Sequence, residues 1–142
     1  GSKQKSLRKY AKKNGILKDV TFVGKVRNTD LVKYLNFADI YISAALSDAG
    51  IAASTAEAMS CKLVTIITRV RENDKWISDG INGYLFEPKN SYELGQKIKK
   101  ALELDTEDRN RMTNQARQTI LSRNDFDTEM SKVIAIYNEL CR

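Results

Sequence analysis

The run Leu63-Val64-Thr65-Ile66-Ile67-Thr68 decides the fold, because it is the strongest strand signal in the chain. β-Branched and aliphatic residues of this kind favour a pleated strand. Three other runs resemble it: Val20-Thr21-Phe22-Val23-Gly24, then Ile40 to Ser43, and Tyr84 to Phe86. We expect the first of them to form a buried strand closed by its glycine.

Helical patterns separate and follow these strands. They cover residues 3–14, 28–38, 51–60 and 71–77, and then 91–104, 106–123 and 127–141 with no further strand. Strands that alternate with helices are typical of an α/β fold with a parallel sheet. We therefore expect a Rossmann-like parallel sheet with flanking helices and a helical C-terminal tail.

Length and composition fit one such domain. The chain has 142 residues, of which 42% are hydrophobic and 30% are charged, enough for one packed core. No apolar stretch approaches the ~20 residues that span a bilayer, and the first residues lack the apolar segment of a secretion signal. Because Gly1-Ser2 resembles the remnant of a cleaved tag, we expect residues 3–142 to form a single, N-terminally truncated domain.

The histidine and cysteine content limits the kinds of catalytic and metal site that the chain can form. Histidine is absent, which excludes Ser-His-Asp and Cys-His catalysis and every His-based zinc site. Cys61 and Cys141 are eighty positions apart and form no C-x-x-C pair. Neither a zinc site nor a disulfide framework is therefore indicated, and a reducing cytosol is the expected compartment.

The positive charge is concentrated at one end of the chain. Residues 1–27 carry nine Lys and Arg against one Asp, whereas residues 28–142 carry fifteen against seventeen acids. Such a segment could contact nucleic acid or anionic lipid, but no aromatic side chains for base stacking are interleaved with its cations. A solvated helix face is the favoured interpretation. We do not expect a nucleic-acid partner, and expect at most a peripheral association with a membrane.

The segment 43–57 is the best place for a ligand, because ligands of open parallel sheets bind beyond the carboxyl ends of the strands. Gly50 permits unusual backbone angles there, and Ala52, Ala53 and Ser54 leave the first helical turn uncluttered. Exposed N–H groups of that turn suit a phosphate or a sugar oxygen. The segment therefore suits an anionic ligand.

Glu57 lies two helical turns after Gly50 on the same face, and helical side chains lean toward the helix N-terminus. Its carboxylate would therefore point at the same space. An unpaired carboxylate among small apolar neighbours is costly, by roughly a few kcal/mol, unless hydroxyls or amides satisfy it. A hydroxyl-rich ligand would do so. The alternative is an ordinary helix residue paired with a lysine such as Lys62.

Several motifs follow one another in a fixed order. The run Glu57-Ala58-Met59-Ser60-Cys61 precedes the strand 63–67, and Asp79-Gly80-Ile81-Asn82-Gly83-Tyr84-Leu85-Phe86 and Pro88 come next. In this order and spacing, residues 3–142 resemble the C-terminal domain of GT-B glycosyltransferases of the retaining GT4 type. The spacing carries the resemblance, since each piece alone is weak.

The resemblance implies transfer of a hexose or related sugar from a nucleotide diphosphate sugar, such as a UDP- or GDP-sugar, to a glycan or lipid-linked acceptor. It implies retention at the anomeric carbon and no required metal or cofactor. Glu57 would bind the ribose hydroxyls of the donor. The remaining donor-binding positions would be the backbone N–H groups of Gly50, Ile51, Ala52 and Ala53 at the sugar and diphosphate, Asp48 at a sugar hydroxyl, and Lys25 and Val26 beside the base. The resemblance identifies no catalytic residue. The alternative interpretation of Lys25 and Val26 is that they are plain loop residues, and that of Asp48 is that it caps a helix.

Three positions depart from the family's pattern. An acid is expected eight residues before Glu57, but Ala49 stands there and Asp48 is displaced by one position. Lys62 and Val64 stand where C-G-x-P has Gly and Pro. A lysine in the left-handed conformation of a helix stop costs roughly 1 kcal/mol relative to glycine. This loop therefore either differs from that of the family or has been altered.

The resemblance also implies parts outside this chain: two upstream strands, an Arg/Lys pair that neutralises the diphosphate, and an N-terminal acceptor domain. Without those strands, Val20–Val23 would be separated from the later strands and the remaining sheet broken or rearranged. We expect an inert fragment whose free strand edges pair with another copy or fragment. The expected location is cytoplasmic, or peripheral at the inner membrane surface. The alternative function is a non-catalytic binding or assembly module that has lost the donor site.

Overall fold

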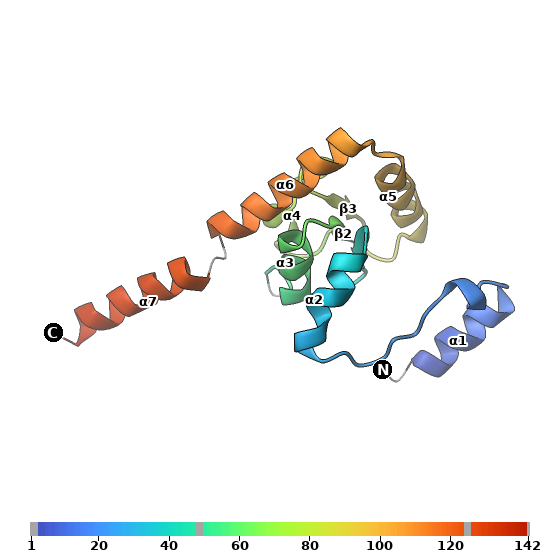
Figure 1. The fold of residues 1–142 in the computed structure, drawn as a ribbon, viewed down its shortest axis with the longest axis horizontal. Coiled ribbons are helices and arrows are strands. Elements are labelled where there is room, and N and C mark those ends of the chain that lie inside the picture. The colour runs from blue at the N-terminus through green and yellow to red at the C-terminus, as the bar shows by residue number, and fades with distance from the viewer. Residues whose placement is uncertain (1–2, 48–49, 124–125, 142) are drawn as a thin grey trace. The chain divides into compact units, whose positions relative to one another are not determined.

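The computed structural model describes residues 3–47, 50–123 and 126–141, so the expected tag remnant Gly1-Ser2 lies outside the described residues. The chain divides into two compact units, residues 1–33 and 34–142. The first unit holds α1 (Gln4–Lys13) and the short 3₁₀ helix η1 (Leu17–Asp19), and α2 (Asn28–Phe37) begins there. The second unit holds β1 (Ile40–Ser43), α3 (Ala53–Ser60), β2 (Val64–Thr68), α4 (Asn73–Trp76), β3 (Tyr84–Phe86), α5 (Ser91–Glu103), α6 (Thr106–Arg123) and α7 (Phe126–Leu140), as labelled in Figure 1.

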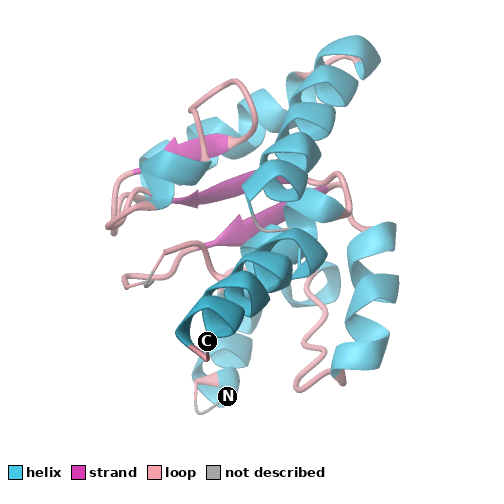
Figure 2. Ribbon diagram, turned by 90° about the vertical axis from the view of Figure 1, so that its left-hand side faces the viewer, coloured by secondary structure: helices cyan, strands magenta, loops and turns pink. Residues whose placement is uncertain are grey.

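The strands of the second unit form one parallel sheet in the order β1-β2-β3. Tyr41 of β1 lies opposite Thr65 of β2, and Ile67 of β2 lies opposite Leu85 of β3. Figure 2 shows the three strands side by side with helices on both sides of them. The predicted parallel α/β sheet with flanking helices is confirmed.

The core lies on both faces of β2, whose five residues are all buried. Ile67 packs with Met59 of α3 and Ala116 of α6 in one hydrophobic cluster. Its neighbour Ile66 packs with Ala101 of α5 in a second cluster. Because successive side chains of a strand point to opposite faces, helices cover the sheet on both sides, as a strand rich in apolar residues requires.

The run Val20–Gly24 is the main error of the sequence prediction. It is neither a strand nor buried: Val20 is 38% exposed and Val23 is 49% exposed. β-Branched residues give the run a strand propensity, but a strand also needs a neighbour that accepts its hydrogen bonds. No strand among the described residues pairs with this run. The expected disruption of the remaining sheet is wrong, because β1 to β3 form one continuous sheet.

The helices α5, α6 and α7 begin and end within one residue of the predicted ranges, whereas α4 is shorter than the predicted range 71–77. None of the described residues of α7 is buried. Among the described residues, no helix is long and apolar enough to cross a membrane.

Candidate functional site

The segment between β1 and α3 leads into an uncapped helix N-terminus. Gly50 has a φ of +82° in open space. The Ala52 carbonyl accepts the N–H groups of Thr55 and Ala56, at 2.9 and 3.0 Å, and no side chain caps this end of α3. The N–H groups of Ala53 and Ser54 therefore have no hydrogen-bond acceptor among the described residues. The helix begins at Ala53, two residues after the predicted start, and the binding of a donor by the N–H groups of Gly50, Ile51, Ala52 and Ala53 stays a prediction.

One contact at this helix end was not predicted from the sequence. The Tyr41 hydroxyl of β1 and the Ser54 hydroxyl of α3 are 2.8 Å apart and share a hydrogen bond. It fixes the first turn of α3 beside the strand that precedes it. A tyrosine in a strand and a serine thirteen residues later carry no local signal of such a contact.

Glu57 lies four residues after Ala53 in the same helix, hence on the same face. Its side chain is half-buried, and no described residue forms a hydrogen bond or an ion pair with its carboxylate. The alternative pairing with Lys62 is not formed. The Glu57 carboxylate, which no described residue pairs, thus lies one helical turn from the N–H groups of Ala53 and Ser54 at the start of α3.

The other predicted site residues lie either outside the described residues or in the first unit. Asp48 and Ala49 lie outside the described residues. Lys25 is exposed and Val26 is half-buried, and both belong to the first unit. Their roles at a sugar hydroxyl and beside the base stay predictions.

Side-chain hydrogen bonds join the carboxyl ends of the strands. The Thr68 hydroxyl at the end of β2 donates to the Ser43 carbonyl at the end of β1, at 3.2 Å. The buried Asn73 side chain donates from Nδ2 to the Thr68 carbonyl at 2.9 Å, and its Oδ1 has no hydrogen-bond donor among the described residues. These bonds hold the ends of β1 and β2 together beneath the start of α3.

Two arginines follow β2 at the same edge, and sequence analysis did not single them out. The Arg69 N–H donates to the Phe86 carbonyl at 2.7 Å, and its guanidinium pairs with Glu87 at 3.0 Å. Arg71 is exposed, has a φ of +47° and forms no ion pair with a described residue. Glu87 balances the charge of Arg69, so Arg71 is the arginine that adds positive charge after the end of β2.

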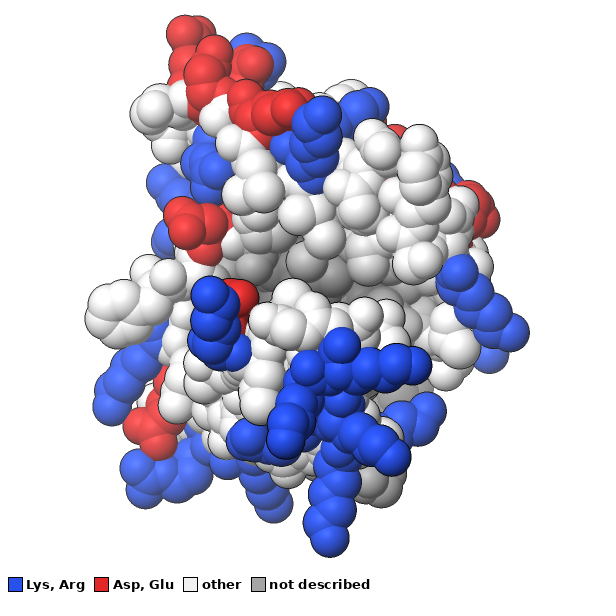
Figure 3. Space-filling view, turned by 90° about the vertical axis from the view of Figure 1, so that its right-hand side faces the viewer, with Lys and Arg blue, Asp and Glu red and all other residues white. Residues whose placement is uncertain are grey.

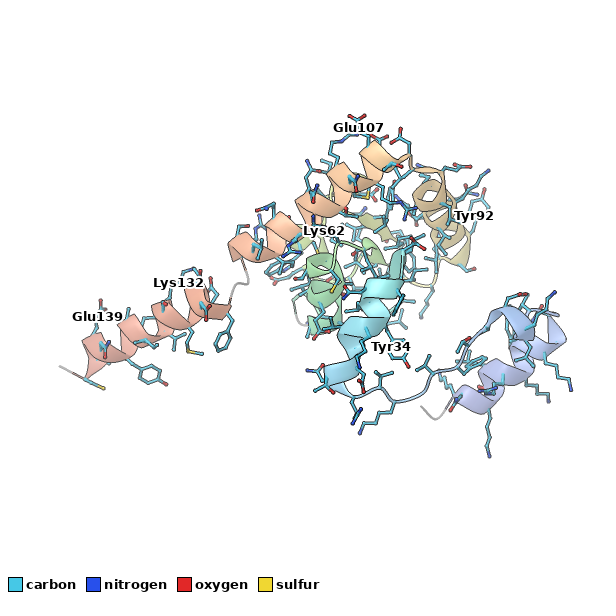
Figure 4. The ribbon with its side chains drawn as sticks, viewed as in Figure 1. Tyr34, Lys62, Tyr92, Glu107, Lys132 and Glu139 are labelled. Atoms are coloured by element: carbon cyan, nitrogen blue, oxygen red, sulfur yellow. The ribbon has the colours of Figure 1, made fainter. Side chains whose placement is uncertain are left out.

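Lys62 lies just beyond the end of α3 (Figure 4) and adopts a φ of +61°. The Lys62 N–H donates to the Met59 carbonyl and the Leu63 N–H donates to the Ala58 carbonyl, both at 3.1 Å. These two bonds define a Schellman motif, which usually has glycine at the position of Lys62. The lysine thus keeps the left-handed helix stop instead of changing the loop.

The Asp79-to-Gly83 motif supports the sheet. Asn82 is buried; its Oδ1 accepts the Ser78 N–H at 2.8 Å, and its Nδ2 donates to the Trp76 carbonyl and the Thr119 hydroxyl, each at 3.0 Å. A Cβ on Gly83 would lie 2.8 Å from the Thr65 carbonyl oxygen of β2. The motif therefore positions β3 against β2 and α6, and contributes no free polar group to the ligand site.

No three His, Cys, Asp or Glu side chains of the described residues come together as in a metal site. Independence from a metal stays a prediction.

Comparisons with known proteins identify the family and the fold of the chain. The family described as "Glycosyl transferases group 1" matches residues 1–119. No curated protein matches the chain. Among solved structures, it is similar to sucrose-phosphate synthase from Thermosynechococcus elongatus (18% identity, TM-score 0.88, covering 99% of this chain and 35% of that chain), to a glycosyltransferase from Rickettsia africae (22%, 0.87, 97% and 36%), and to Anabaena HepE in complex with UDP-glucose (21%, 0.85, 95% and 36%). The chain thus spans 35–36% of the length of these three structures, and at such identities the likeness shows the fold.

Proposed function

Because the chain belongs to the glycosyl transferases group 1 family, and its sheet and helices form the Rossmann-like domain of the GT-B fold, we propose that it is the donor-binding part of a retaining glycosyltransferase. In this proposal a nucleotide sugar binds at the carboxyl edge of the sheet, over the start of α3. The acceptor, a glycan or a lipid-linked sugar, binds a separate domain of the same enzyme.

The observation that carries the proposal is that, among the described residues, nothing pairs the Glu57 carboxylate and nothing accepts the N–H groups of Ala53 and Ser54 one helical turn before it. A helix N-terminus carries about half a positive charge and attracts a diphosphate. A carboxylate only accepts hydrogen bonds and therefore suits the hydroxyl donors of a ribose. One ligand satisfies both kinds of group if it contains a diphosphate and a ribose, as a nucleotide sugar does.

The same groups have a role in the reaction. The bond between the anomeric carbon and a diphosphate oxygen breaks, the acceptor hydroxyl oxygen bonds to that carbon, and the hydroxyl proton passes to the leaving diphosphate oxygen, on which negative charge develops in the transition state. N–H groups that are already aimed at the diphosphate stabilise this charge without reorganising. The exposed Arg71 guanidinium adds positive charge at the same edge. In this proposal no catalytic acid or base comes from this chain, and no metal is required.

The remaining predicted residues complete the proposed site. The N–H groups of Gly50 and Ile51 extend the row of donors toward the sugar, and Asp48 contacts a sugar hydroxyl. Lys25 and Val26 lie beside the base. HepE, which was solved with UDP-glucose, makes a uridine nucleotide the first donor to test.

The test is a calorimetric titration of UDP, GDP and ADP into this chain and into the longest natural form of the protein. We expect one of the nucleotides to bind, and Glu57→Ala to weaken that binding at least tenfold. Glu139→Ala removes an exposed carboxylate from α7 (Figure 4) and should leave the affinity unchanged. Absence of binding in both forms would instead favour the assembly module.

A further inference from the structure

Helix α1 carries its cations on one side. Lys5, Arg8, Lys9, Lys12 and Lys13 all lie within Gln4–Lys13, and at 3.6 residues per turn they fall on one broad face. Ala11, the only buried residue of the helix, lies on the opposite side. We call this surface, formed by those five cations, the basic face. It points away from the packed side of α1.

The charges of the basic face are not neutralised within their unit. Asp19 is the only acidic residue of residues 3–27, and none of the five cations forms an ion pair with a described residue. Arg8 has the one described contact, its guanidinium lying 4.7 Å from the centre of the Phe22 ring. Figure 3 shows a cluster of Lys and Arg side chains in the lower part of the view. Such a field attracts an anionic surface.

We propose that the basic face docks the protein on an anionic lipid bilayer. Clusters of four to eight Lys and Arg are typical of segments that bind anionic headgroups, and each cation near the surface increases membrane affinity about fivefold. Leu7 is 53% exposed but lies four residues before Ala11, and therefore on the side of α1 opposite the basic face. The proposed docking is therefore electrostatic.

A nucleic-acid partner fits these observations less well. Aromatic side chains that stack on bases supply much of the affinity for single strands. None of the five residues of the basic face is aromatic, and the Phe22 ring that lies against it already contacts the Arg8 guanidinium. Tyr10 is 65% exposed, but the helical period places it outside the basic face. The anionic partner is therefore assigned as a lipid surface, a property of the chain that is independent of nucleotide binding at Glu57.

The test is co-sedimentation of the chain with vesicles of phosphatidylcholine, with and without about 30 mol% phosphatidylglycerol. We expect binding to the anionic vesicles alone, weakening steeply as the salt concentration rises. The triple variant Lys5→Gln, Lys9→Gln, Lys12→Gln should lose about a hundredfold in affinity. The triple Lys→Arg variant at the same positions keeps the charge and should bind as the unmodified chain does.

A second control removes three exposed lysines elsewhere, as Lys89→Gln, Lys99→Gln and Lys100→Gln, and leaves the same net charge as the first variant. It should keep most of the binding. The proposal would be overturned if the chain bound neutral vesicles as tightly as anionic ones, or if both Gln variants lost the same amount of binding. It would also be overturned if the chain bound an RNA oligonucleotide more tightly than the anionic vesicles. Nucleotide titration of the Lys5/Lys9/Lys12 variant separates this result from the donor site, because that affinity should not change.

Discussion

Lys97 of α5 donates hydrogen bonds to both carboxylate oxygens of Asp79, at 2.9 and 2.6 Å. Asp79 Oδ1 also accepts the backbone N–H of Leu85 in β3, at 2.9 Å. Burial raises the pKa of Asp79, but the hydrogen bonds from Lys97 and Leu85 and the charges of Lys97 and Arg69 together lower it below its usual value. This pair therefore joins the turn before β3 to the helix that follows it.

Replacing Asp79 by Asn should lower the free energy of unfolding by about 1–2 kcal/mol at pH 7, since a partly exposed ion pair with hydrogen bonds is lost. The pKa of Asp79 is lower in the folded state, so its contribution is present above about pH 4 and disappears as the pH falls through the folded-state pKa. Urea denaturation of both proteins at pH 7 and near pH 3 measures the difference in their free energies of unfolding at each pH. An undiminished difference between the two proteins at low pH would contradict the assignment.

Gly83→Ala should lower the free energy of unfolding by about 1–3 kcal/mol, because the added methyl group would meet the Thr65 carbonyl at 2.8 Å. Gly95→Ala is the matched control. Gly95 lies within α5 and has no atom near the added methyl group, so alanine there should stabilise by about 0.5–1 kcal/mol. Thermal unfolding of the two variants compares them, and a similar effect at both positions would show that the contact is not restrictive.

Lys62→Gly should raise the free energy of unfolding by roughly 1 kcal/mol, because glycine adopts a φ of +61° without the strain that a side chain brings. Lys62→Ala removes the same charge and keeps the Cβ, so it should give little or no gain. Denaturant titrations of the three proteins decide this. If alanine stabilised as much as glycine, removal of the lysine charge would be the cause.

The sequence predicts the second unit well because its signals are local. The apolar run of β2 and the periodic patterns of α5 and α6 each indicate their own element, and the order of the motifs identifies the family. The prediction of a strand at Val20–Gly24 is wrong for the opposite reason. A strand forms only where a partner strand is present, and the propensity of its own residues does not indicate such a partner.

The candidate site could be predicted only in part. Gly50, Ala53 and Glu57 lie within one turn and helix, so their spacing alone places them together. Other features of the site depend on how β1, α3 and the end of β2 pack. They are the hydrogen bond between Tyr41 and Ser54, the burial of Asn73 and the exposure of Arg71. Those contacts join residues far apart in the chain, which a single sequence does not indicate.

The most direct test of the proposed function compares the nucleoside diphosphate that binds with its 2′,3′-dideoxy analogue, using the unmodified protein and Glu57→Gln. If Glu57 holds the ribose hydroxyls, removing the hydroxyls or removing the carboxylate charge should each weaken binding by about 10- to 100-fold. Making both changes together should cost little more than one, because the two partners share one interaction. The assignment of Glu57 to the donor ribose would be contradicted if the fold-losses in affinity from the two changes multiplied. It would also be contradicted if the Glu57→Gln protein still discriminated fully between the two nucleotides.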